Sequence, residues 1–201
     1  VGTFGYTKGP VDIKGKGIGR VHHLRLALIA ASASLLASAP VLAQDRPAFA
    51  EEVLAAHNEA RADMGVPPLA WNDKLAADAA AWAQRLSGHA TLRHSGVSDQ
   101  GENLWLGTRD YFDAATMVSH WVEEKAHYHA GRFPDNSSTG NWADVGHYTQ
   151  IVWRTTREVG CARVGDAELD YLVCRYSPPG NWLGEDPIGP AGRRMAGSAG
   201  R

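Results

Sequence analysis

Apolar side chains recur at helical spacing in three stretches of the chain. The first stretch, residues 49–64, is closed by Gly65 and a pair of prolines. The second begins at Asn72, a residue type that caps helix N-termini well, and runs to residue 86. The third begins at Asp113 and reaches about residue 128. The pattern therefore predicts three helices, in this order.

Apolar and polar residues alternate in two later stretches, Glu158–Val164 and Leu169–Tyr176. A Gly-Asp turn lies between them, so these stretches are expected to pair as an antiparallel hairpin. Two cysteines, Cys161 and Cys174, fall on the two neighbouring strands. An oxidising compartment permits a bond between them, and we predict that they form a disulfide.

Three shorter signals lie between the helices and the hairpin. Residues 103–106 form a short apolar piece that favours a strand, and residues 147–153 are apolar and aromatic, which favours a short helix. Residues 131–144 are rich in Gly, Pro, Asn and Ser and predict a long surface loop, a feature that is usually functional or mobile. Helices followed by a short-stranded sheet indicate an α+β domain whose helices cover the faces of the sheet.

The beginning of the chain differs in composition from the rest. Arg25 is followed by a run from Leu26 to Ala43 made almost wholly of Ala, Leu, Ile, Val and Ser. A basic residue, an apolar core and small residues at the end are typical of a secretory signal peptide, with cleavage after Ala43. The alternative is a membrane anchor, but the apolar core is shorter than the roughly 20 residues of a spanning helix. We expect an exported protein without stable membrane insertion.

These observations divide the chain into four parts. Residues 1–20 are Gly- and Lys-rich without apolar periodicity, and are expected to be an unstructured extension or a miscalled start. Residues 21–43 are the predicted signal peptide, and residues 44–187 are the predicted domain. Residues 188–201 have no apolar pattern and are expected to be a disordered tail.

Charge narrows the range of partners. The full chain has 20 Lys and Arg against 22 Asp and Glu, and removal of the first 43 residues leaves 15 against 21, a net charge of −6. Because phosphate neutralisation needs clustered Lys and Arg, we expect no nucleic-acid partner. We also expect the domain to be a monomer.

Candidate chemistry rests on histidine and glutamate. The sequence has no HExxH, no GxSxG, no Gly-rich phosphate loop and no cysteine spacing typical of zinc. It does place His94, Glu102, Glu124 and His147 next to apolar stretches. A carboxylate on an apolar face must be paired, hydrogen-bonded or protonated. If the four side chains converge, they satisfy one another and can bind a divalent metal through the imidazoles. The alternative is four unrelated polar residues in solvent.

A rival arrangement lies on one predicted helix. His120, Glu124 and His127 fall at i, i+4 and i+7, which makes either a one-helix metal site or a solvated face with ordinary ion pairs. His57, beside the apolar stripe of the first helix, is expected to be a structural histidine. Trp142, in the polar loop, is the tryptophan expected to line a surface cleft.

Five segments carry a resemblance to a known family. They are His57–Arg61 (HNEAR), Gly101–Leu104 (GENL), Trp121–Lys125 (WVEEK), Gly146–Trp153 (GHYTQIVW) and Tyr171–Trp182 (YLVCRYSPPGNW). In this order they resemble the CAP superfamily of cysteine-rich secretory proteins, antigen 5 and pathogenesis-related protein 1, and the plant pathogenesis-related branch most of all. Plant members carry six cysteines and this chain has two, so the resemblance supports only the Cys161–Cys174 pairing.

The resemblance implies an α-β-α sandwich with a central antiparallel sheet and a cleft lined by two His and two Glu. Matched position by position, the four residues are His94, Glu102, Glu124 and His147, with His89 as an alternative to His94. Family members can bind zinc or another divalent ion through the two His, and some bind sterols or fatty acids in other grooves. We therefore expect zinc or another divalent metal at these residues.

Three functions are compatible with such a site. The first is a secreted, non-enzymatic module that binds a divalent metal and uses its clefts for lipid, sterol or cell-envelope ligands. The second is a metal- or His/Glu-dependent extracellular hydrolase, such as a protease, for which Ser95 is the nearest candidate nucleophile. The third is a purely structural group that braces loops to a helix. We favour the first.

Overall fold

The computed structural model describes residues 46–189, so the predicted extension, the predicted signal peptide and the predicted tail beyond Gly189 lie outside the described residues. The elements in chain order are α1 (Arg46–Asp63), β1 (Ala70–Trp71), α2 (Asp73–Leu86), β2 (Gly101–Thr108), α3 (Ala114–Val122), the 3-10 helices η1 (Glu123–His127) and η2 (Trp142–Asp144), α4 (Gly146–Ile151), β3 (Glu158–Gly165) and β4 (Leu169–Ser177). None of the described helices has the length and apolar character needed to cross a membrane.

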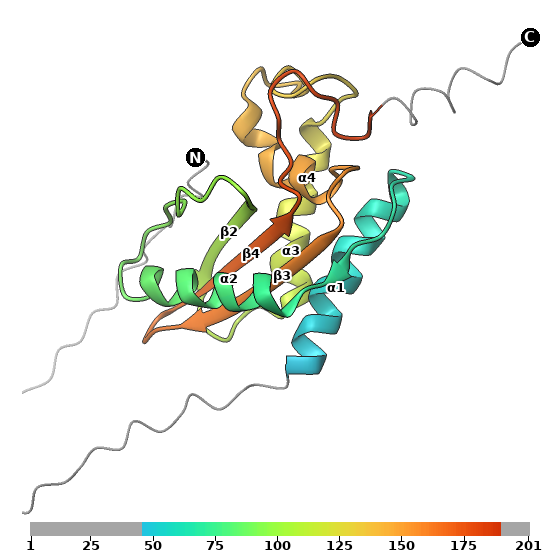
Figure 1. Ribbon diagram of the computed structural model, residues 1–201. Coiled ribbons are helices and arrows are strands. Elements are labelled where there is room, and N and C mark those ends of the chain that lie inside the picture. The colour runs from blue at the N-terminus through green and yellow to red at the C-terminus, as the bar shows by residue number, and fades with distance from the viewer. Residues whose placement is uncertain (1–45, 190–201) are drawn as a thin grey trace, which may run out of the picture. The chain divides into compact units, whose positions relative to one another are not determined.

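The sheet has the order β1-β3-β4-β2, and helices lie on both of its faces (Figure 1). β2 and β3 each pair with β4 in antiparallel orientation, whereas the short β1 pairs in parallel with β3. Helix α2 covers one face, while α1, α3 and α4 lie on the other (Figure 1). The predicted α+β class, an α-β-α sandwich, is confirmed.

Side chains of β4 point alternately to the two faces of the sheet and contribute to a hydrophobic cluster on each face. Tyr171 and Val173 pack in the cluster that includes Leu86 of α2. Leu172 and Cys174, which point to the opposite face, pack in the larger cluster with residues of α1 and α3. Because both faces are covered, β4 is buried along nearly its whole length.

Local capping explains where two helices begin. The Asn72 side chain accepts hydrogen bonds from the backbone N–H groups of Lys74 and Leu75, and Asp113 accepts one from Thr116. Both predicted N-caps are confirmed. The third helix is shorter than predicted, because α3 ends at Val122 and the chain continues as η1.

The predicted hairpin and disulfide are confirmed. Cys161 and Cys174 lie directly opposite each other in the β3–β4 register. The two sulfur atoms are bonded, with 4.1 Å between the Cα atoms. Two cysteines on facing positions of one hairpin therefore form a staple within the central sheet.

Two residues of the HNEAR segment fix the fold from within. The buried Arg61 guanidinium donates through Nη1 to the carbonyls of Ile151 (2.7 Å) and Trp153 (2.9 Å), and so ties α1 to the end of α4. The His57 ring bonds the Val53 carbonyl at 2.7 Å and the Tyr176 hydroxyl at 2.8 Å. His57 is therefore a structural histidine, as predicted.

The segment predicted as a long surface loop, residues 131–144, is only partly exposed. Phe133 and Asn136 are buried. Backbone hydrogen bonds join Phe133 to Gly184 (2.7 Å) and to Glu185 (2.8 Å). Its polar composition hid this pairing, because the partner segment lies far along the sequence. At the other end of the domain, Ile188 packs against the larger core cluster, so the packed chain extends past the expected boundary at residue 187.

Candidate functional site

Two separate His–Glu pairs make up the candidate site. In the first, the Nδ1 atom of His94, in the loop after α2, lies 2.7 Å from the Oε1 atom of Glu102 on β2. The backbone N–H of Ser95 donates to the same oxygen at 2.9 Å. His94, and not the exposed His89, is therefore the imidazole that contacts Glu102.

A buried arginine holds the other side of this carboxylate. Arg175 faces Glu102 in the β2–β4 register, and its Nη2 atom lies 3.0 Å from Glu102 Oε2. Burial would raise the pKa of Glu102, but the bonds from His94 and Ser95 and the charge of Arg175 outweigh it and hold that pKa below its ordinary value. Glu102 is thus kept ionised in a buried position.

The second pair joins η1 to the start of α4. His147 Nδ1, at the start of α4, lies 2.6 Å from Oε1 of Glu124 in η1. Oε2 of Glu124 accepts from the backbone N–H groups of His147 (2.9 Å) and Tyr148 (3.0 Å). The His147 ring also stacks on Trp121, with ring centroids 5.9 Å apart and an interplanar angle of 18°.

Both pairs present the same chemistry. Each carboxylate accepts from an imidazole Nδ1, so each neutral ring keeps the Nε2 lone pair for another partner. The side chain of His94 is 58% exposed and that of His147 is 26% exposed. Imidazole Nε2 is a good ligand for zinc, and a carboxylate on Nδ1 is the usual way to orient such a ligand.

The four predicted residues do not converge as a close cluster of metal-binding donor atoms. Among the described residues, the group whose three donor atoms lie within 4.8 Å of one another is His57, Cys161 and Cys174, and its two sulfurs are consumed by the disulfide. The four predicted residues form no such group.

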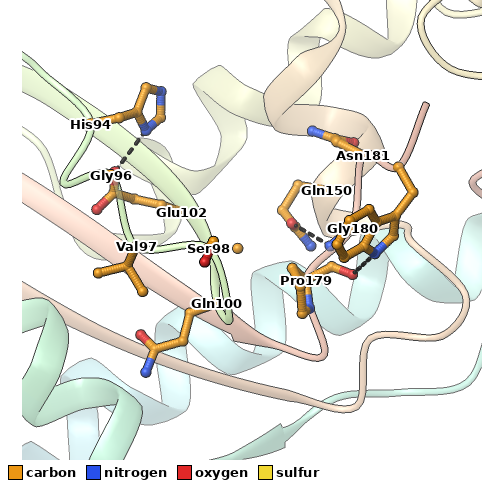
Figure 2. Close-up of a pocket in the computed structure, with 12 residues that line it drawn as sticks. His94, Gly96, Val97, Ser98, Gln100, Glu102, Gln150, Pro179, Gly180 and Asn181 are labelled. Atoms are coloured by element: carbon orange, nitrogen blue, oxygen red, sulfur yellow. Dashed lines mark hydrogen bonds and ion pairs between the residues drawn. The ribbon is translucent and has the colours of Figure 1, made fainter.

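A cavity of about 330 Å³ opens beside the first pair (Figure 2). One wall is the segment from His94 to Glu102, and the facing wall comes from the segment that follows β4, together with Gln150. Glu124 and His147 do not line it. The lining residues are His94, Gly96, Val97, Ser98, Gln100, Gly101, Glu102, Gln150, Pro179, Gly180, Asn181 and Trp182.

Two other residue sets are predicted from the sequence, the one-helix group around Glu124 and the cleft residue Trp142. The one-helix arrangement is split, because His120 Nδ1 accepts from the indole of Trp105 at 2.9 Å while Glu124 contacts His147. Trp142 is half exposed but does not line this cavity; Trp182 does. That Trp142 lines a surface cleft elsewhere stays a prediction.

Sequence reasoning also missed Arg175. The signal was present, since a charged residue inside a strand that is otherwise buried requires a partner. What the sequence does not give is the register that places Glu102 opposite it.

Comparison with known proteins agrees with this architecture. Residues 54–176 match the CAP family, described as the cysteine-rich secretory protein family. Pathogenesis-related protein 1A of Nicotiana tabacum is 45% identical over 68% of this chain and 79% of its own. Pathogenesis-related protein 1 of Arabidopsis thaliana is 39% identical over 74% of this chain and 86% of its own.

Solved structures share the fold at lower identity. The structure of NaASP2 with Zn2+ has a TM-score of 0.62 and 23% identity, covering 75% of this chain and 89% of that one. BmVAL-1 has a TM-score of 0.61 and 19% identity, covering 71% and 82%. The family match and the identity to the plant relatives show that this chain belongs to the CAP family, the cysteine-rich secretory proteins.

Proposed function

We propose that this chain is an exported CAP-family binding module that holds a divalent metal such as zinc between His94 and His147. The observation that carries the proposal is that each imidazole has its Nδ1 atom fixed by a buried or half-buried carboxylate. Glu102 and Glu124 then act on the rings rather than on the metal, setting the tautomer and the direction of each Nε2 atom. When bound, the metal supplies a positive charge with positions open to water or ligand.

The electrostatics favour a cation. Two carboxylates flank the imidazoles, and the one counter-charge described beside them is Arg175, which lies against Glu102. NaASP2, a structural relative, was solved with Zn2+; for this chain the proposal rests on its own donor groups. Export is supported by the predicted signal peptide. In this reading lipid, sterol or cell-envelope molecules are the ligands that the clefts of the domain take.

The described contacts favour binding over hydrolysis. A serine nucleophile needs a base within hydrogen-bond reach and a third group to orient that base. The Ser95 hydroxyl accepts from the backbone N–H of Val97 at 3.3 Å, and among the described residues no hydrogen bond joins this hydroxyl to a histidine.

Zinc titration tests the proposal directly. Untagged wild-type protein, titrated calorimetrically at pH 7.5, is expected to bind one zinc ion, and His94→Ala and His147→Ala are each expected to weaken binding by about tenfold or more. His89→Ala is the matched control, because His89 is an exposed histidine close to His94 in sequence and has no contact with Glu102 in the described structure. Only neutral imidazole ligates, so binding should also weaken at pH 5.5. A wild type without bound zinc, or two histidine variants that bind as the wild type does, would overturn the proposal.

A further inference from the structure

The cavity beside His94 has a lining with a distinctive chemistry. Its polar side chains are mostly uncharged: Ser98, Gln100, Gln150 and Asn181 carry hydroxyl or amide groups. Among the described lining residues, Glu102 is the one Asp, Glu, Lys or Arg, and its charge is met by Arg175. A site without a net local charge favours a neutral ligand over a phosphate, a nucleotide or an acidic peptide.

An indole forms part of the rim. Trp182 is half exposed, and its Nε1–H donates to the Pro179 carbonyl at 3.0 Å. That bond holds the ring in place and uses its one donor. Trp182 therefore offers a ligand its flat face, and not a hydrogen bond.

The facing wall offers a hydrogen-bond acceptor. The Nδ1 atom of His94 is held by Glu102, so in the metal-free protein the Nε2 lone pair of the neutral ring is left for a ligand hydroxyl. On the indole side, the buried Gln150 is held rigidly, because its Oε1 atom accepts from the backbone N–H of Gly180 at 2.9 Å and its Nε2 atom donates to the Thr156 hydroxyl at 3.3 Å. The two walls therefore present fixed polar groups on either side of the hollow (Figure 2).

Size and polarity argue against a lipid in this cavity. Its volume of about 330 Å³ lies at the lower end of the range for small-molecule sites. The apolar lining is limited to Val97, Pro179 and Trp182, too little to cover a sterol or an acyl chain. A ligand that fits carries many hydroxyl groups, has one apolar face for the indole, and has no charge.

We infer that this cavity binds a neutral saccharide, with one sugar ring against Trp182 and its hydroxyl groups toward His94 and the amide side chains. The inference rests on the proposed function, which it deepens by naming the class of cell-envelope ligand. It shares His94 and Glu102 with the metal proposal but not His147 and Glu124, which do not line the cavity.

The test uses isotope-labelled, metal-free wild-type domain titrated with two neutral probes, the trimer of N-acetylglucosamine and the glucose trimer cellotriose. We expect at least one probe to give saturable shifts of the Trp182 indole N–H and of the Gln100, Gln150 and Asn181 side-chain amides in protein-observed NMR spectra. The indole of Trp142, half exposed and outside the cavity, is the internal control and should not shift.

A pair of matched tryptophan variants tests whether the saccharide binds in this cavity. Trp182→Ala should weaken saccharide affinity about tenfold or more, since an aromatic face contributes strongly to such contacts, whereas Trp142→Ala should leave it unchanged. Should Trp182→Ala not fold, Ser98→Trp, which fills the hollow from the facing wall, should abolish binding. Absence of saturable shifts with both trimers, or undiminished affinity in these cavity variants, overturns the inference. So does a result in which cholesterol micelles shift these resonances and neither saccharide does.

Zinc titration of the same samples separates the two proposals. Saccharide binding without zinc binding would overturn the metal site and leave the saccharide site standing. Zinc binding without saccharide binding would do the reverse.

Discussion

In both His–Glu pairs an imidazole Nδ1 atom contacts a carboxylate oxygen, but different groups hold the two carboxylates in place. Glu102 depends on a side chain, the buried guanidinium of Arg175, with one backbone N–H from Ser95. Glu124 depends on the backbone alone beyond its histidine, through the N–H groups of His147 and Tyr148 at the start of α4. The first pair can therefore be disrupted by a substitution far away in the sequence, at Arg175. Among the described residues the second pair has no such side chain, because the backbone of α4 itself holds its carboxylate.

The largest expected effect comes from removing the cation of the first pair. Arg175→Met leaves the buried Glu102 carboxylate without its counter-charge, which should lower the free energy of unfolding by about 3–5 kcal/mol. Urea unfolding at pH 7 measures this. The double variant Arg175→Met with Glu102→Gln should recover a large part of the loss, because no buried charge then stands alone.

A substitution in the second pair, Glu124→Gln, is expected to lower the free energy of unfolding less. Glu124→Gln keeps an oxygen that can accept from the backbone N–H groups, so we expect a smaller loss of stability than Arg175→Met causes. If Arg175→Met instead costs no more than Glu124→Gln, the guanidinium does not hold the first pair and the comparison fails.

Acid is expected to weaken the fold first at His57, away from both pairs. Burial lowers the pKa of His57 from 6.5 to about 4. Between these values the unfolded chain binds more protons than the folded one, so stability falls as the pH drops below about 6.5, by about 3 kcal/mol once pH 4 is reached. The lowered pKa of Glu102 adds a loss only below its ordinary value of 4.5.

Urea unfolding from pH 7 to pH 5 therefore isolates the histidine. His57→Gln should be less stable than the wild type at pH 7, because the ring bonds the Val53 carbonyl and the Tyr176 hydroxyl. Its stability should then change less with pH over this range. An equal pH dependence in the variant would assign the acid sensitivity to another group.

The smallest expected effects concern metal affinity. Glu102→Gln and Glu124→Gln each remove a carboxylate that orients an imidazole, and loss of such partners weakens metal binding about 10–100-fold. The loss should be larger for Glu124→Gln, since the His147 ring is the less exposed of the two and has fewer alternative partners. Calorimetric zinc titrations at pH 7.5 measure both, and equal affinities in wild type and variants would show that the carboxylates do not act on the metal site.

Much of the fold follows from short-range sequence features. The caps at Asn72 and Asp113 use backbone N–H groups within three residues, so residue type and position predict them. The hairpin joins neighbouring strands, and its alternation places Cys161 opposite Cys174. The four His and Glu residues were matched through family motifs, which preserve position in the chain.

Other features were decided only by the tertiary structure, because they join residues that are distant in the sequence. Pairing of Glu102 with Arg175 depends on the β2–β4 register, and a shift of one residue would turn either side chain to the opposite face. The backbone pairing of Phe133 with Glu185 has no compositional signal. The cavity exists because the loop that holds His94 folds opposite the segment that carries Trp182. Local conformational propensity acts over a few residues. The strand register and the placement of the two cavity walls opposite each other are set by the packing of the whole core.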